Sequence, residues 1–329
     1  MKFELTVNTF PESEEYLKII YKNKKYKLND FASEFQDEED IFFLDRLLES
    51  CKIEYNGEII TYEQMCQEAR KLDKSLYTPR IYSSRIYPIE KRIFIIDKDY
   101  YAAGKLIKSA EEQIKLGRYS LIKACNIIDF NINNNWKAGY TANYVQRAIY
   151  ANNAIMWYNN VFDSIMQVIF FAFEIYKKHP KYNSKDGFHK TLKLCNYAFL
   201  SDYYGKYKHV PNFSKLWSII SGAQKINENI NKWANYIKHK GGLKYKGLEA
   251  KEPIEMIEKK GIDIIKDTEF EAFEVSLDDV IKELKNSHKK LCESINKLVN
   301  FMNFESVDYI NKDNKLALPQ KSIYKKVLF

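Results

Sequence analysis

The stretch ANYVQRAIYANNAIMWYNNVFDSIMQVIFFAFEIYKK, residues 142–178, predicts that the fold is built around one long helix. Its apolar residues recur at intervals of three and four, and further apolar residues lie beside them. A helix with such a wide apolar stripe is largely buried by its neighbours. The positions that set this rhythm are Tyr144, Ala148, Ala151, Ile155, Tyr158, Phe162, Ile165, Ile169 and Phe173.

The same spacing predicts further helices downstream. A shorter helix is expected over residues 188–199, and two longer ones follow with narrow apolar rows that suit helix pairing. Ser276, followed by Asp278 and Asp279, has the residue types of a capped helix start, so the last long helix is expected to begin there. The two rows are Leu216, Ile219, Ala223, Ile226, Ile230, Trp233 and Ile237, and Leu277, Ile281, Leu284, His288, Leu291, Ile295, Leu298 and Met302.

The first hundred residues mix strand and helix patterns. Residues 3–8 alternate at strand period, and Asn56-Gly57 predicts a two-residue hairpin turn. Helical spacing appears in residues 37–51 and 62–72. RIFIID, residues 92–97, is interpreted as a buried strand.

A chain of 329 residues exceeds the size at which one hydrophobic core usually keeps growing, so more than one part is expected. We predict an α+β module over residues 1–97, a helical bundle over residues 98–305 and a polar C-terminal tail over residues 306–329. The predicted fold class is therefore mainly α, with a smaller N-terminal α+β module.

Composition excludes several classes of protein. With 45% hydrophobic and 29% charged residues, the chain has the composition of a globular protein. The richest apolar run, residues 168–176, is too short to cross a bilayer, and the first residues lack the pattern of a secretory signal. We therefore expect a cytoplasmic protein without membrane contact. The five cysteines form no closely spaced pairs, so neither a disulfide framework nor a metal site is predicted.

The net charge of +8 permits a polyanionic partner. Lysine supplies most of the positive charge, and an AT-rich genome would also favour lysine codons, so the lysine content by itself does not identify a ligand. Arginine occurs only at Arg46, Arg70, Arg80, Arg85, Arg92, Arg118 and Arg147.

The stretch NKWANYIKHKGGLKYKG, residues 231–247, contains the strongest candidate site. On a helical wheel, Lys232, Asn235, Lys238 and His239 fall opposite the apolar row, and Asn235 and His239 are neighbours four residues apart. One interpretation is a helix end whose last cations are followed by the glycine pair. The other is a phosphate site in which His239 acts as acid or base and the amide and lysines hold phosphoryl oxygens.

The residues from Ala234 to His239 resemble the signature of the HEPN superfamily. In that signature Arg precedes His by four to six residues and is commonly followed by Asn, Asp or His. With four intervening residues Asn235 matches the position after Arg, and Ala234 stands where Arg is expected. With six intervening residues Lys232 takes the Arg position and Trp233 follows it. HEPN domains are helical bundles, and the predicted helical part of this chain has the same character. The resemblance therefore covers about half of the chain.

The resemblance implies an RNA-related function. Members that keep both motif residues are often metal-independent RNA endonucleases that pair their motifs across a dimer interface, and others keep only a binding role. It implies His239 and Asn235 as catalytic residues, Lys232 and Lys238 as substrate-binding residues, and no cofactor or metal. Because a lysine lacks the two fixed parallel donors of a guanidinium, the absence of Arg at Ala234 predicts slow cleavage or none.

Two functions are therefore left open. The first is a bacterial HEPN-like homodimer that binds RNA and cleaves it without metal, in a defence or toxin–antitoxin setting with an antitoxin-like protein partner. The second is a non-catalytic dimeric interaction module that binds RNA, nucleotide or a protein partner. Ala234 favours the second, and the spacing from Asn235 to His239 favours the first.

Two weaker candidates lie elsewhere. His288 falls on the apolar row of the last helix, where a lone histidine is interpreted as a hydrogen-bonded packing residue. A mixture of tyrosine and arginine is a candidate for stacking on single-stranded RNA. Its members are Tyr82, Tyr87, Tyr100, Tyr101, Arg80, Arg85 and Arg92.

Overall fold

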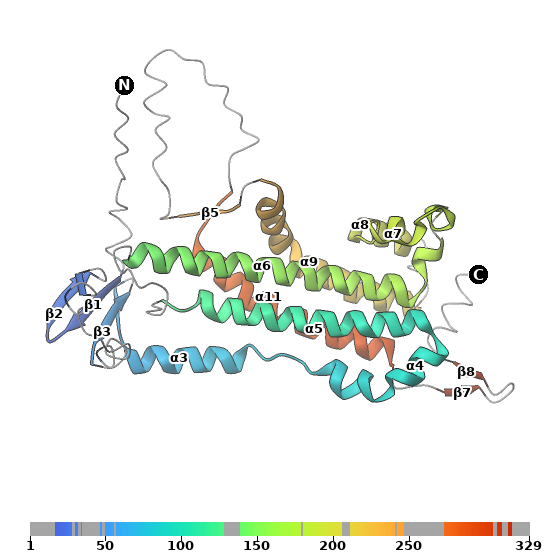
Figure 1. Cartoon of the computed structure of the whole chain (residues 1–329), viewed down its shortest axis with the longest axis horizontal. Helices are drawn as coiled ribbons and strands as arrows, with labels where there is room; N and C mark the ends of the chain where they lie inside the picture. The colour runs from blue at the N-terminus through green and yellow to red at the C-terminus, as the bar shows by residue number, and fades with distance from the viewer. Residues whose placement is uncertain are drawn as a thin grey trace, which may run out of the picture. The chain divides into compact units, whose positions relative to one another are not determined.

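The structure is a computed structural model of the whole chain. It describes residues 17–27, 30–31, 34, 47, 50–55, 57–127, 139–178, 180–205, 211–240, 242–246, 273–304, 308–310 and 315–317. Within these residues the protein is mainly helical, with a small antiparallel sheet near the N-terminus, as predicted (Figure 1). None of the described helices is long and apolar enough to cross a membrane.

The described chain forms two compact units. Unit 1 comprises residues 1–75, 120–153 and 233–283, and unit 2 comprises residues 76–119, 154–232 and 284–329. Each unit draws on three separate stretches, because each of the four long helices contributes residues to both. Neither unit is therefore one continuous segment such as the predicted 1–97 or 98–305.

Unit 1 contains a four-stranded antiparallel sheet in the order β2-β1-β3-β4, drawn in blue in Figure 1. The strands are β1 (Leu17–Tyr21), β2 (Lys24–Lys27), β3 (Lys52–Tyr55) and β4 (Glu58–Thr61). Tyr55 pairs with Glu58 across the β3–β4 turn, and Gly57 has a φ of +82°, which glycine adopts without strain. The predicted hairpin is confirmed, although Asn56 itself lies outside the described residues.

The sheet buries one apolar cluster against the rest of unit 1. Side chains from β1, β2 and β3 and from residues between β2 and β3 form its centre, and the partly buried Tyr144 of α6 (Gly139–Ala172) packs on it. The buried members are Ile19, Tyr26, Phe31, Leu47, Cys51 and Ile53.

Helix α3 (Tyr62–Ser75) begins directly after β4 with a reciprocal cap. Thr61 Oγ1 accepts from the Gln64 backbone N–H at 3.1 Å, and Gln64 Oε1 accepts from the Thr61 N–H at 2.8 Å. These bonds satisfy two backbone donors that the first turn leaves open. The helix predicted over residues 62–72 is thus confirmed. The short parallel pair β5 (Lys244–Tyr245) and β6 (Glu274–Val275) completes unit 1.

Unit 2 is a bundle in which α6 is the common partner. Gln113 of α5 (Lys98–Ala124) accepts from Ser164 at 3.1 Å, and Asn159 accepts from Asn227 of α9 (Pro211–His239) at 3.3 Å. Tyr158 bonds to His288 of α11 (Leu277–Met302) at 2.8 Å. Residues of α6 on several sides thus contact three other helices. The wide apolar stripe predicted this burial.

The two longer helices predicted after α6 are also confirmed. Ser276 Oγ accepts from the Asp279 N–H at 3.4 Å at the start of α11, as the residue types at this position predicted. The apolar row of α9 is buried at Leu216, Ile219, Ala223, Ile230 and Trp233.

Short helices and one antiparallel strand pair complete unit 2, and two predictions there are wrong in detail. The single helix expected over residues 188–199 is two, because Asn196 Oδ1 accepts from the Phe199 N–H at 2.9 Å and so caps a second helix. The long helix α6 ends at Ala172, before the predicted Lys178, and Glu174 takes a left-handed φ of +53°. The elements are η6 (Ile175–Lys178), η7 (Pro180–Asn183), α7 (Gly187–Leu192), α8 (Tyr197–Gly205), β7 (Asp308–Ile310) and β8 (Lys315–Ala317).

The interpretation of residues 92–97 as a buried strand is wrong. The chain there is α4 (Glu90–Ile96), preceded by the π-helix η2 (Tyr82–Ile86) and the 3₁₀-helix η3 (Tyr87–Ile89). Ile93 is buried, but Phe94 and Ile95 are 47% and 77% exposed. A short apolar run does not distinguish strand from helix, and here the helix places two apolar side chains on the surface.

Several predictions lie outside the described residues. These are the strand over residues 3–8, nearly all of the helix over residues 37–51, and most of the tail over residues 306–329.

Candidate functional site

The exposed side of the last turns of α9 carries the predicted site residues. Lys232, Asn235, Lys238 and His239 are all exposed, while Trp233 is buried, as the helical wheel predicted. Because one residue adds about 1.5 Å along a helix, Asn235 and His239 are separated by about 6 Å of rise and Lys232 by about 10 Å from His239. The four side chains therefore lie along one exposed side of a single helix, and we name Lys232, Asn235, Lys238 and His239 the α9 row.

The end of α9 is closed by a glycine cap. The backbone N–H groups of Lys240 and Gly242 both donate to the Tyr236 carbonyl, at 2.9 and 3.2 Å, and Gly242 has a φ of +107°. The Lys240 ammonium lies 5.3 Å from the centre of the Tyr236 ring. The cations of the last turn thus face the negative end of the helix dipole, as the capping interpretation expects. That interpretation does not account for Lys232 and Asn235, which precede the last turn.

Ala234 has no exposed surface, although it stands at the Arg position of one motif alignment. An arginine there would extend from the buried side of α9, whereas Asn235 and His239 are exposed. In the other alignment Lys232 takes the Arg position, and this lysine is exposed in the same row as His239. The geometry therefore favours Lys232 as the cationic member of the row.

The predicted row is polar, and Lys238 and His239 make no side-chain hydrogen bond or ion pair with any residue that the structure describes. Both side chains are thus available to a ligand. An imidazole, an amide and two ammonium groups can together neutralise a phosphodiester and exchange a proton with it.

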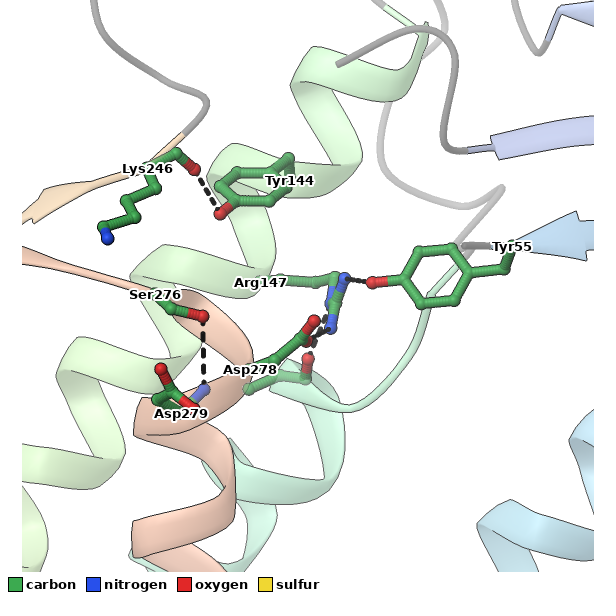
Figure 2. A network of polar contacts seen from close by, with 8 residues as sticks. Tyr55, Tyr144, Arg147, Lys246, Ser276, Asp278 and Asp279 are labelled. Carbon is green, nitrogen blue, oxygen red and sulfur yellow. Dashed lines mark hydrogen bonds and ion pairs between the residues drawn. The ribbon is translucent and has the colours of Figure 1, made fainter. Parts of the chain in front are cut away.

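A buried arginine of unit 1 that the sequence patterns did not predict as a site lies at the centre of a polar network, which Figure 2 shows. Arg147 of α6 is 6% exposed, and its Nε donates to the Ala124 carbonyl at 2.9 Å. Its Nη1 donates to the Tyr55 hydroxyl at 3.1 Å, and its Nη2 pairs with Asp278 at 3.3 Å. The guanidinium therefore joins the ends of β3 and α5 to the first turn of α11.

A second tyrosine extends this network along α6. The hydroxyl of Tyr144 donates to the Lys246 carbonyl at 2.7 Å (Figure 2). Burial raises the pKa of Tyr144 to about 12, so it stays a neutral donor. Because the donors of Arg147 bind protein acceptors on three elements, we assign the network to folding and not to ligand binding. A detectable signal was present, since Arg147 is three residues from Tyr144 on the buried stripe.

His288 is a packing residue, as predicted. It is 1% exposed, its Nδ1 accepts from the Tyr158 hydroxyl at 2.8 Å, and its Nε2 donates to the Tyr77 carbonyl at 2.9 Å. The Tyr77 carbonyl can only accept, so Nε2 carries a proton, and because burial disfavours the charged ring the Tyr158 hydroxyl donates to a neutral imidazole. Burial lowers the pKa of His288, so protonation is disfavoured in the folded protein.

The lowered pKa of His288 predicts that acid destabilises unit 2. The unfolded chain binds a proton near pH 6.5 and the folded chain binds it only at lower pH, so the free energy of unfolding falls as pH drops below about 6.5. The slope from this group is at most about 1.4 kcal/mol per pH unit. We expect the free energy of unfolding, measured with urea at several pH values between 7.5 and 5, to change less with pH for His288→Gln than for the starting protein. His239→Gln, the same change at an exposed position, is the control, and equal slopes in all three proteins would contradict the prediction.

An acidic group lies in unit 2 but is occupied by protein partners. Oxygen atoms of Asp97, Asp99 and Glu174 lie within 4.8 Å of one another. Asp99 accepts from the Tyr176 hydroxyl at 2.6 Å and from the Lys177 ammonium at 2.7 Å, while Asp97 Oδ1 accepts from the N–H groups that open α5. Lys177 also pairs with Glu174 at 3.5 Å, so each of the three carboxylates has a protein partner.

The tyrosine–arginine mixture is only partly exposed. Tyr82 and Tyr100 are 6% and 0% exposed, so these two rings are not available for stacking, contrary to their proposed role. Tyr87 is 66% exposed. Arg85 donates to Asn300 at 2.5 Å, whereas Arg80 and Arg92 are exposed.

Comparison with known proteins adds no family. No protein-family model matches the chain, and neither the curated proteins nor the solved structures contain a match. The class is therefore the one that the structure defines, a mainly helical protein with a small four-stranded antiparallel sheet and an exposed basic row on one long helix.

Proposed function

We propose that the protein binds RNA through the exposed row of Lys232, Asn235, Lys238 and His239 on α9. The observation that carries the proposal is that these side chains share one exposed side of the helix while the apolar row is buried. Two ammonium groups supply charge for a phosphodiester backbone, and an exposed imidazole and amide lie between and beside them. The resemblance to the HEPN superfamily gives the same residues a role toward RNA.

Cleavage without metal follows from the same chemistry. An RNA 2′-hydroxyl attacks its own phosphate when a base removes its proton and an acid protonates the leaving oxygen, and an imidazole can serve in either role. His239 is the histidine of the row, and Asn235 lies one turn before it to orient the phosphate. A lysine at position 232 gives charge without a fixed fork, so we expect cleavage to be slow.

A non-catalytic module is the second candidate, and the burial of Ala234 favours it. With Ala234 at the Arg position, the guanidinium of the family motif is absent and its place lies in the packed interior. The protein would then bind RNA, nucleotide or a protein partner as a dimer without cleaving RNA.

The binding test compares two double variants of α9. Lys232→Gln with Lys238→Gln should weaken binding of a labelled single-stranded RNA about tenfold and reduce the slope of log affinity against log salt by about 1.4, since two phosphates lose their contacts. Lys215→Gln with Lys225→Gln removes the same charge from exposed positions on the same helix and should change the affinity less than about twofold. Fluorescence anisotropy at salt concentrations between 50 and 200 mM measures both the affinity and its salt slope. The salt slope reports contacts between cations and phosphates, because contacts without charge do not depend on salt in this way.

Cleavage is then measured on the same RNA in chelator. Slow cleavage that His239→Ala abolishes supports the nuclease, and binding without cleavage supports the non-catalytic module. Equal affinities for the two double variants, or no binding of RNA, would remove the α9 row as the RNA site.

A further inference from the structure

A second surface, on unit 2, combines exposed rings with exposed cations. Tyr87 and Phe94 are 66% and 47% exposed, and Ile95, the residue after Phe94, is 77% exposed. Lys91 and Arg92, on the same short helix α4, are exposed as well. We name Tyr87, Lys91, Arg92, Phe94 and Ile95 the α4 surface.

The exposed rings of the α4 surface are held in place from beneath. Tyr87 lies 6.3 Å from the ring of Tyr82, and Phe94 meets the ring of Tyr101 edge-on at 5.0 Å. The ammonium of Lys105 lies 5.5 Å from the Tyr82 ring and 5.2 Å from the Tyr101 ring, so one lysine joins both pairs. The two exposed rings are therefore connected through Tyr82, Tyr101 and Lys105 in one cluster.

The carboxylates near the α4 surface are already neutralised or hydrogen-bonded. Glu90 pairs with Lys105 and accepts from the Tyr82 hydroxyl at 2.7 Å, which lowers the pKa of Glu90. Asp97 accepts from backbone N–H groups at the start of α5. Lys91 and Arg92, in contrast, have no side-chain partner among the residues that the structure describes. The charge that this surface presents is therefore positive.

A positive, aromatic surface selects its ligand by charge. A second copy of the chain bound face to face would bring Lys91 and Arg92 against the same cations, which is unfavourable. The depression lined by Tyr82, Glu90, Tyr101 and Lys105 is too small to hold a water molecule, so it does not take in a compact ligand. An extended polyanion has the opposite charge and can lie along the surface without entering a cavity.

We infer that the α4 surface binds single-stranded RNA, with bases stacked on Tyr87 and Phe94 and phosphates held by Lys91 and Arg92. This inference rests on the proposed RNA binding and adds that the bases are unpaired, since a duplex does not offer its base faces to side chains. Arginine is rare in a chain that otherwise uses lysine, and a guanidinium both pairs with phosphate and stacks on a base. RNA is favoured over an acidic peptide because the exposed rings have no role toward carboxylates.

The test separates stacking from charge and this surface from the α9 row. Tyr87→Leu and Phe94→Leu keep an apolar side chain but remove the ring, and each should weaken binding of a labelled uridine oligonucleotide about tenfold without changing the salt slope. Lys91→Gln with Arg92→Gln should reduce the slope by about 1.4. Tyr119→Leu, at a 56% exposed tyrosine of α5, is the matched control and should bind like the starting protein. A duplex of the same length should compete weakly.

The outcomes distinguish the two proposals. If both leucine variants bind like the control while the α9 lysine variant loses affinity, the α4 surface is not an RNA site and the proposed function stands. If the leucine variants lose affinity and the α9 variant does not, the α4 surface is supported and the α9 row fails. The inference would be overturned if duplex and single-stranded RNA competed equally. It would also be overturned if a polyglutamate peptide displaced RNA while the leucine variants bound RNA normally. If the protein does not bind RNA, both the proposed function and this inference are wrong.

Discussion

Arg147→Met is expected to lower the free energy of unfolding by about 3 kcal/mol. Methionine has a similar length and keeps the apolar packing, but it leaves the Ala124 carbonyl without its charged donor and removes the bond to Tyr55. A buried acceptor left unpaired costs about 1–3 kcal/mol, and a hydrogen bond from a charged group is worth about 1.5–3 kcal/mol. Urea unfolding monitored by circular dichroism measures the loss.

Two further variants identify which contact of Arg147 carries the effect. Asp278 has a side chain that is 61% exposed, so Asp278→Asn should cost less than about 1 kcal/mol. Arg147→Lys keeps the charge but has no planar fork to reach Ala124, Tyr55 and Asp278 together, so it should lose most of what methionine loses. A small loss for Arg147→Met, equal to that of Asp278→Asn, would mean that the network is a surface ion pair and not a fixed point of unit 1.

The long helices were predictable because their patterns are long. The apolar rows of α6, α9 and α11 repeat over many turns, and such repetition leaves one periodicity that fits. Asn56-Gly57 was equally informative, since few residues tolerate the backbone of a tight turn. Short segments failed for the corresponding reason. Residues 92–97 contain one apolar run of a length that either a strand or a helix can have, and the contacts of α4 with the rest of unit 2 decide between them.

The α9 site was predictable because it depends on one helix, whereas the Arg147 network depends on several elements. The exposure of His239 and Asn235 follows from helical geometry alone. Arg147 has partners in residues 55, 124 and 278, and no spacing along the chain brings these together. The resemblance to the HEPN signature does not by itself fix which residue corresponds to the arginine of that signature, because both spacings are permitted and only burial distinguishes Ala234 from Lys232.

Ala234→Arg is expected to lower the free energy of unfolding by about 3 kcal/mol or more, although it would complete the family motif. Ala234 has no exposed surface, so the new side chain has to displace packed neighbours or bury its charge. Overpacking alone costs about 1–3 kcal/mol, and an unpaired buried charge adds to it. Loss of the folded baseline in urea unfolding at 25 °C measures the effect, and the variant is therefore unsuited to restoring cleavage.

Lys232→Arg is the matched change at the exposed alternative. Both side chains are good helix formers, so the free energy of unfolding should stay within about 0.5 kcal/mol. The guanidinium would add a planar phosphate clamp to the row that contains Asn235 and His239, and cleavage of labelled RNA in chelator should rise about tenfold and disappear again with His239→Ala. If instead Ala234→Arg folds with unchanged stability and cleaves RNA while Lys232→Arg does not, position 234 reaches the RNA, and the burial of Ala234 does not decide between the two alignments.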